Sequence, residues 1–142
     1  MSNVPEFHAY DSNEVSINAL GILVEGGFSS DTLITITMTN DRYKEYEGAD
    51  GSVSRSDTHS RIAKVELHLA QTSPTNAALA AAFAAGVIGP IEVADLNGAS
   101  LHKCSKAWII KQPDANYKRD VDVRTWTFTA ADMDSFSGGQ LA

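Results

Sequence analysis

The sequence is poor in the residues that most often form cross-links or hold nucleic acid. Among its 142 residues there is one cysteine, Cys104, so an intrachain disulfide is excluded and a reducing compartment is expected. Cations are in the minority, since 11 Lys and Arg stand against 18 Asp and Glu, for a formal charge of −7. A chain this acidic is not expected to bind nucleic acid by neutralising phosphates.

Long hydrophobic runs and export signals are also lacking. Residues 1–6 contain neither the basic nor the apolar segment of a signal peptide, and the weakly polar stretch 77–89 is too short to span about 30 Å of hydrocarbon. We therefore expect no membrane insertion, and a protein assembled in the cytoplasm. The length suits one domain, 1–142, that buries a sizeable core.

Motifs that carry catalysis or cofactors are absent as well. The sequence has no G-x-S-x-G elbow, no Walker loop and no dinucleotide fingerprint. Its histidines are scattered and have no companion cysteine cluster: His8, His59, His68 and His102. We predict no catalytic residue, no cofactor and no metal site, and hence no enzyme.

What the sequence does contain is the two-residue alternation of β-strands. In residues 32–39 an apolar face alternates with a face of Thr35, Thr37 and Thr39. In residues 61–71 the apolar positions alternate with Lys64, Glu66 and His68. Further strands are expected at 15–17, 20–24, 91–96, 103–111 and 123–130. Six or seven strands predict a mainly β fold, a β-sandwich or open barrel with one flanking helix.

That helix is expected to begin at Ser73, a natural N-cap, with Pro74 in its first turn. Leu79 and Phe83 lie four residues apart on one face, and Gly86 supplies the stop. Trp108, Trp126 and Phe128 lie in alternating strands. We expect these three aromatic residues, with Leu79 and Phe83, to anchor the core.

Between two strands lies a hydrophilic loop, residues 40–60, that is too long to be a plain connection. It contains an Asp-Gly turn signal, two tyrosines and charges of both signs. We predict that it protrudes and makes contacts in an assembly, through Asp41, Arg42, Tyr43, Lys44, Tyr46, Glu47, Asp50, Gly51 and Arg55. Residues 1–13 and 131–142 are expected to be terminal arms.

Four runs of the sequence resemble bacteriophage tail tube proteins. They are QTSPTN at 71–76 before the predicted helix, GADGSVSR at 48–55 in the long loop, AWIIKQP at 107–113, and RTWTF at 124–128. The resemblance extends from about residue 15 to residue 139, and the fold of type VI secretion tubes looks similar.

The resemblance implies a structural subunit of the virion tail, assembled as stacked hexameric rings around a channel for genome ejection and enclosed by a contractile sheath. It implies contacts with itself and with sheath, tape measure and tail terminator or baseplate proteins, while genomic DNA passes without specific binding. We expect the threonine face and Glu66 to line the lumen. The alternative is a carbohydrate- or ligand-binding β-sandwich module, which would be monomeric.

Overall fold

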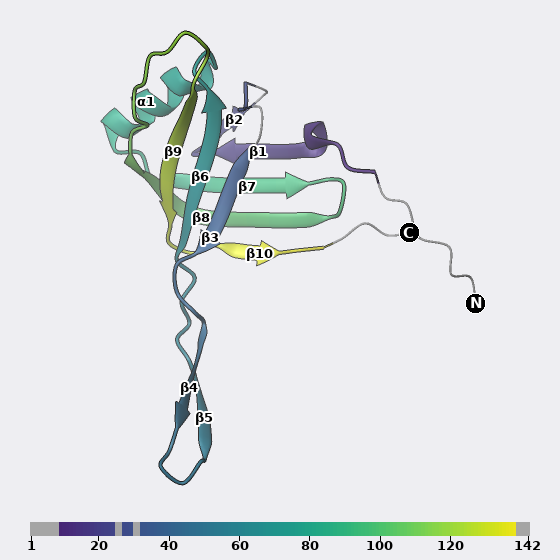
Figure 1. Cartoon of the computed structure of the whole chain (residues 1–142), viewed down its shortest axis with the longest axis vertical. Helices are drawn as coiled ribbons and strands as arrows, with labels where there is room; N and C mark the ends of the chain where they lie inside the picture. The colour runs from purple at the N-terminus through teal and green to yellow at the C-terminus, as the bar shows by residue number, and fades with distance from the viewer. Residues whose placement is uncertain (1–8, 25–26, 30–31, 139–142) are drawn as a thin grey trace, which may run out of the picture.

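The computed structural model describes residues 9–24, 27–29 and 32–138, and these form a mainly β fold with one helix (Figure 1). After a 3-10 turn, Ser12–Glu14, the elements are β1 (Val15–Ala19), β2 (Ile22–Val24), β3 (Ile34–Met38), β4 (Tyr43–Glu47), β5 (Val53–Asp57), β6 (Ala63–Ala70), α1 (Thr75–Ala85), β7 (Gly89–Asp95), β8 (Ser100–Lys111), β9 (Val123–Ala130) and β10 (Asp134–Phe136). The predicted fold class is confirmed. The strand count of six or seven was too low, because β4, β5 and β10 have no buried face to give an apolar alternation.

The main strands form one antiparallel sheet, in the order β2-β1-β7-β8-β9-β6-β3, with β10 also paired to β8. The twelve-residue β8 connects the β2-β1-β7 part of the sheet to the β9-β6-β3 part, because it pairs first with β7 and then with β9. Register shifts at Gly89/Ile91 and Ile109/Lys111 interrupt these pairings, and such bulges bend strands. In Figure 1, β1, β7 and β8 run across the view while β3, β6 and β9 run down it, so a single sheet bends over its own core.

The core lies on the concave side of this sheet. Along β6 the predicted apolar face is buried, and the polar residues between are exposed or half-buried. Register places Val65 opposite Phe128 and Leu67 opposite Trp126, and Leu79 of α1 packs into the same cluster. Trp126, Phe128 and Leu79 are all buried. Burying one such side chain contributes about 1.5–3 kcal/mol to folding.

Helix α1 ends where the sequence predicts. Gly86 adopts φ 66°, and the Val87 N–H donates to the Ala82 carbonyl at 3.1 Å, which closes the last turn. At the other end Pro74 takes the cap position expected for Ser73. The Ser73 hydroxyl still accepts from the Thr75 N–H at 3.4 Å. In the described part of the chain no helix is long and apolar enough to cross a membrane.

Two residues expected in the core lie at its edge instead. Trp108 and Phe83 are each 37% exposed. In β8 it is Ala107 and Ile109 that point inward, so the alternation turns Trp108 outward. Leu79 is the buried residue of α1, and Phe83 lies one turn closer to the helix end. As core anchors, both predictions are wrong.

The terminal segments are held more closely than arms would be. Asp11 and Asn97 exchange hydrogen bonds, backbone N–H to Oδ1 at 3.0 Å and Nδ2 to carbonyl at 2.8 Å. Within the expected C-terminal arm, Met133 is buried and β10 joins the sheet. Residues 1–8 and 139–142 of the two expected arms lie outside the described residues.

Candidate assembly surfaces

The most prominent surface feature is a hairpin, β4–β5, that projects from one end of the molecule (Figure 1). Its strands form a separate two-stranded sheet, in register from Tyr43 opposite Asp57 to Glu47 opposite Val53. Every residue of both strands is exposed. The strands alone extend about 17 Å, at about 3.3 Å per residue. Since these strands bury nothing within the subunit, the hairpin is available for contacts outside it.

The tip of the hairpin is ordered by its own hydrogen bonds. Gly51 takes φ 86°, and the Gly48 N–H donates to the Ser52 carbonyl at 2.8 Å. The Asp50 Oδ1 atom accepts from the Ser52 hydroxyl at 2.7 Å and from the Ser52 N–H at 3.1 Å. These two bonds lower the pKa of Asp50. The Asp-Gly signal therefore marks a turn, within a five-residue loop rather than a two-residue one.

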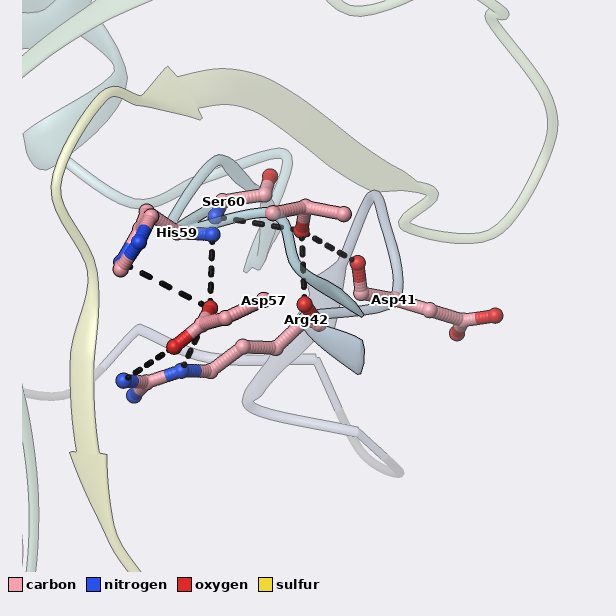
Figure 2. A network of polar contacts seen from close by, with 6 residues as sticks. Asp41, Arg42, Asp57, His59 and Ser60 are labelled. Atoms are coloured by element: carbon pink, nitrogen blue, oxygen red, sulfur yellow. Dashed lines mark hydrogen bonds and ion pairs between the residues drawn. The ribbon is translucent and has the colours of Figure 1, made fainter. Parts of the chain in front are cut away.

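A polar network fixes the base of the hairpin (Figure 2). Arg42 reaches across the strands with two donors, Nε and Nη2, each 3.4 Å from one oxygen of Asp57. The same carboxylate accepts from the His59 N–H at 2.9 Å. The Thr58 hydroxyl lies 2.8 Å from the carbonyl oxygens of both Asp41 and Arg42. The two chains entering and leaving the hairpin are therefore bound to each other where they leave the sheet.

Asp57 is the centre of this network. Its pKa is lowered, chiefly by the hydrogen bond from the His59 backbone and next by Arg42, whose own pKa is raised by Asp57. His59 adopts φ 56°, a left-handed conformation that is unusual for a side-chain-bearing residue. The hydrogen bond from the His59 N–H to Asp57 holds His59 in this conformation, at the point where the chain leaves the hairpin.

Aromatic and charged side chains alternate along the two hairpin faces. On one face the guanidinium groups of Arg55 and Arg42 lie 4.5 and 5.3 Å from the ring centre of Tyr43. On the other face lies Tyr46, 70% exposed, and at the tip Val53 is similarly exposed. All nine residues expected in the contact loop lie on this hairpin or at its base. Sequence reasoning missed Asp57, Thr58 and His59, whose roles depend on pairing across the hairpin.

The threonine face of β3 is exposed to solvent, and it continues across the neighbouring strands β6 and β9. Two rows cross β3, β6 and β9: Thr35–Glu66–Thr127 and Thr37–Lys64–Thr129. Thr39 follows β3 and is also exposed. The Lys64 ammonium lies 3.0 Å from a Glu66 oxygen, so the charges within these rows compensate each other. The threonines of β9 were missed as a continuation of this face, although their alternation in residues 123–130 is visible in the sequence.

The QTSPTN run has a structural role. The Asn76 amide donates to the carbonyls of Ala70 at 3.0 Å and Ser73 at 3.1 Å, and its Oδ1 accepts from the Trp126 indole N–H at 2.9 Å. Gln71 accepts from the Asp122 N–H at 3.2 Å. Two of the runs that carry the family resemblance, 71–76 and 124–128, are therefore joined directly by the hydrogen bond between Trp126 and Asn76.

An apolar groove is open to solvent where α1 ends against β8. It is lined by Phe83, Val87, Ile88, Trp108 and neighbouring apolar atoms, and Ile88 is 64% exposed. Exposed apolar clusters of this kind mark contact surfaces. Among the described residues there is no group of three or more His, Cys, Asp or Glu side chains that could hold a metal ion.

A bent antiparallel sheet with a projecting hairpin and an open apolar groove defines a β-rich structural protein with surfaces for association. The chain belongs to the bacteriophage PhiTE tail tube protein family, whose model matches residues 11–138. The resemblance to phage tail tube proteins is thereby confirmed.

A curated relative and solved structures agree with this assignment. The chain is 28% identical to structural protein ORF10 of Pseudomonas phage KPP10 over 126 residues, which cover 80% of this chain and 69% of that protein. Its fold is similar to the tube-terminating cap of the anti-feeding prophage, with a TM-score of 0.68 at 14% identity, covering 96% of this chain and 97% of that one. It is also similar to a chain of the sheath-tube complex of the extracellular contractile injection system PVC, with a TM-score of 0.58 at 13% identity, covering 91% and 92%.

Proposed function

We propose that this chain is the repeating subunit of a phage tail tube, assembled as hexameric rings that stack into the channel for genome ejection. The observation that carries the proposal is the β4–β5 hairpin, which is ordered at its tip and base yet exposed along its whole length. The hairpin strands are exposed in their own subunit, so they are free to contact a subunit of the next ring. Membership of the tail tube family supports the same role.

Ring stacking then uses the hairpin residues. Tyr46 and Val53 supply apolar area, and charges from Asp41 to Arg55 pair with the neighbouring ring. The open groove beside Trp108 supports association in the same way, because aromatic side chains are enriched in the buried centres of interfaces.

The lumen is proposed to be lined by Thr35, Thr37, Thr39 and Glu66. This face is exposed, and its Lys64–Glu66 pair leaves it without net cationic charge. Unpaired cations would contact many phosphates in register along the tube, and these attractions would add. A neutral wall lets the genomic DNA pass without specific binding.

In the virion the tube would contact a contractile sheath, a tape measure protein and a tail terminator or baseplate protein. Structures of similar fold come from a tube-terminating cap and from a complex of sheath and tube. Assembly in the host cytoplasm, a purely structural role and the absence of any cofactor belong to the same proposal. A carbohydrate- or ligand-binding module is the alternative, and it requires a monomer.

The proposal is tested with purified protein. Wild-type chain at high concentration should form rings or tubes visible by negative-stain electron microscopy. Deletion of residues 47–54 removes the hairpin tip and nothing from the core, so the variant should keep the circular dichroism spectrum of the wild type and fail to polymerise. Tubes of normal length from the deletion variant, or a wild type that remains monomeric, would contradict the proposal.

A further inference from the structure

Arg124 is a cation in an unusual place, on the core side of the sheet near the start of β9. Arg124 lies two residues before the buried Trp126, so the two side chains are on the same side of β9, and its cross-strand partner is Leu69 of β6. Its Nη1 atom is buried and has no hydrogen-bond partner among the described residues. No ion pair in that part of the chain involves Arg124. A buried guanidinium nitrogen without an acceptor costs free energy, so this position calls for a hydrogen-bond acceptor, and a carboxylate is the acceptor that also balances the charge.

The surroundings of Arg124 form an open pocket between the start of α1 and the β8–β9 connection, residues 112–122. The pocket is lined by Gln71, Asn76, Gln112, Tyr117 and Trp126, together with small apolar groups. The Tyr117 ring centre lies 5.5 Å from the Arg124 guanidinium, and Tyr117 is 82% exposed. Arginine and tyrosine in an open pocket are the residue types that dominate the energetics of protein interfaces.

Nearby carboxylates do not fill this need. The Asp122 Oδ1 atom accepts from the Val123 N–H at 2.9 Å and lies 3.8 Å from the Lys118 ammonium. It is therefore already engaged by its own neighbours. The anion for Arg124 has to come from elsewhere.

The pocket and the hairpin lie at opposite ends of the long axis of the molecule. In Figure 1 the β8–β9 connection and α1 are at the top, and β4–β5 is at the bottom. A tube that grows by head-to-tail stacking joins two different surfaces, one from each end of the subunit. With the long axis of the subunit along the tube, the surface that receives the hairpin lies at the end where the Arg124 pocket opens.

We propose that the Arg124 pocket receives a carboxylate from the hairpin tip of a second copy of this chain, and that Glu47 supplies it. This inference rests on the proposed tube function and names the acceptor site for its stacking contact. Glu47 ends β4 beside the turn, is exposed, and forms no ion pair within the described residues. Asp50, the other acidic residue at the tip, is held by Ser52. Tyr117 then packs against the exposed Val53, which is paired with Glu47 and lies on the same face of the hairpin.

The test is a charge exchange in the full chain. Arg124→Gln and Glu47→Gln should each raise the critical concentration for tube assembly by about tenfold or more, as expected for loss of a charge-assisted hydrogen bond. Glu47→Arg and Arg124→Glu should each block assembly, and the variant that carries both changes should assemble again. Arg119→Gln and Glu92→Arg change the same charges at exposed positions that do not line the pocket, and should assemble as the wild type does.

A second measurement holds even if Arg124→Glu fails to fold. In tubes assembled above the raised critical concentration, a chain with Glu47→Cys and Tyr117→Cys should give a disulfide-linked ladder under oxidising conditions, and one with Glu92→Cys and Tyr117→Cys should not. Normal tubes without the ladder, or normal assembly of Arg124→Gln, would overturn this inference and leave the tube function intact. A wild type that never assembles would overturn both.

Discussion

At the residue scale, the molecule depends on a few side chains that join segments far apart in the sequence. Asn76 is the clearest case, since its one amide group binds three backbone carbonyls before the helix and the indole of Trp126 fifty residues later. Arg42 and Asp57 do the same at the hairpin base. Each is a polar residue whose role cannot be recognised from its neighbours in sequence.

Replacing Asn76 by Ala should destabilise the subunit by about 1–3 kcal/mol, because the Trp126 indole N–H loses its acceptor and the Ala70 and Ser73 carbonyls each lose the side-chain amide donor. Urea denaturation followed by Trp fluorescence measures this change. Asn116→Ala, at an exposed position of the β8–β9 connection, is the matched control and should leave the midpoint unchanged. Equal stability of the two variants would show that the Asn76 contacts contribute nothing.

At the scale of elements, the direction of the hairpin depends on the hydrogen bonds that join its two strands at the base. The base is closed by an ionised Asp57, which accepts from His59 and Arg42. Its pKa is lowered in the folded chain, so its contribution is complete above the unfolded value of about 3.9 and is lost as the pH falls through the folded value. Acid should therefore loosen the hairpin base before it affects a core made of apolar residues.

We expect the His59 amide proton resonance to move upfield on acidification, with a midpoint below about pH 4, as Asp57 is protonated. Asp57→Asn should abolish this transition. The Ser52 amide reports on Asp50 in the same sample and should titrate in both proteins. A His59 transition that persists in Asp57→Asn would assign the hairpin base to another group.

At the scale of the whole molecule, the subunit has distinct ends and faces: a hairpin, a pocket that contains Arg124, an open apolar groove and a threonine face. Such an uneven distribution suits a subunit with different neighbours on different sides. The central rows of the threonine face carry no net cationic charge, which is why we propose that this face lies toward the DNA.

Phage assembled with Thr37→Lys should form tails but eject DNA more slowly than wild type, because each ring adds cations that attract phosphates. The delay should be largest at low salt, where screening is weak. Ejection followed by dye fluorescence at two salt concentrations measures it. Ala84→Lys, on the exposed side of α1 across the sheet, is the control. A wild-type ejection rate for Thr37→Lys at both salt concentrations would remove this face from the lumen.

Much of the local structure could be predicted from the sequence alone. The limits of β9, the inward face of β6, the helix stop at Gly86 and the turn at Gly51 all match expectation. Each depends on a signal contained in a few consecutive residues: a two-residue alternation of polarity, or a backbone angle that glycine adopts without strain. The mainly β class follows from the number of such signals.

Only the tertiary structure decided which side of an element meets the core and which residues meet each other. Trp108 alternates as a core residue would, but β8 bends between two partners and turns it outward. The Arg42–Asp57 pair and the Arg124 pocket combine residues about 15 to 50 positions apart. The reason is physical. Alternation in the sequence defines the two faces of a strand, but the packing of distant strands and a helix decides which of the two faces is buried.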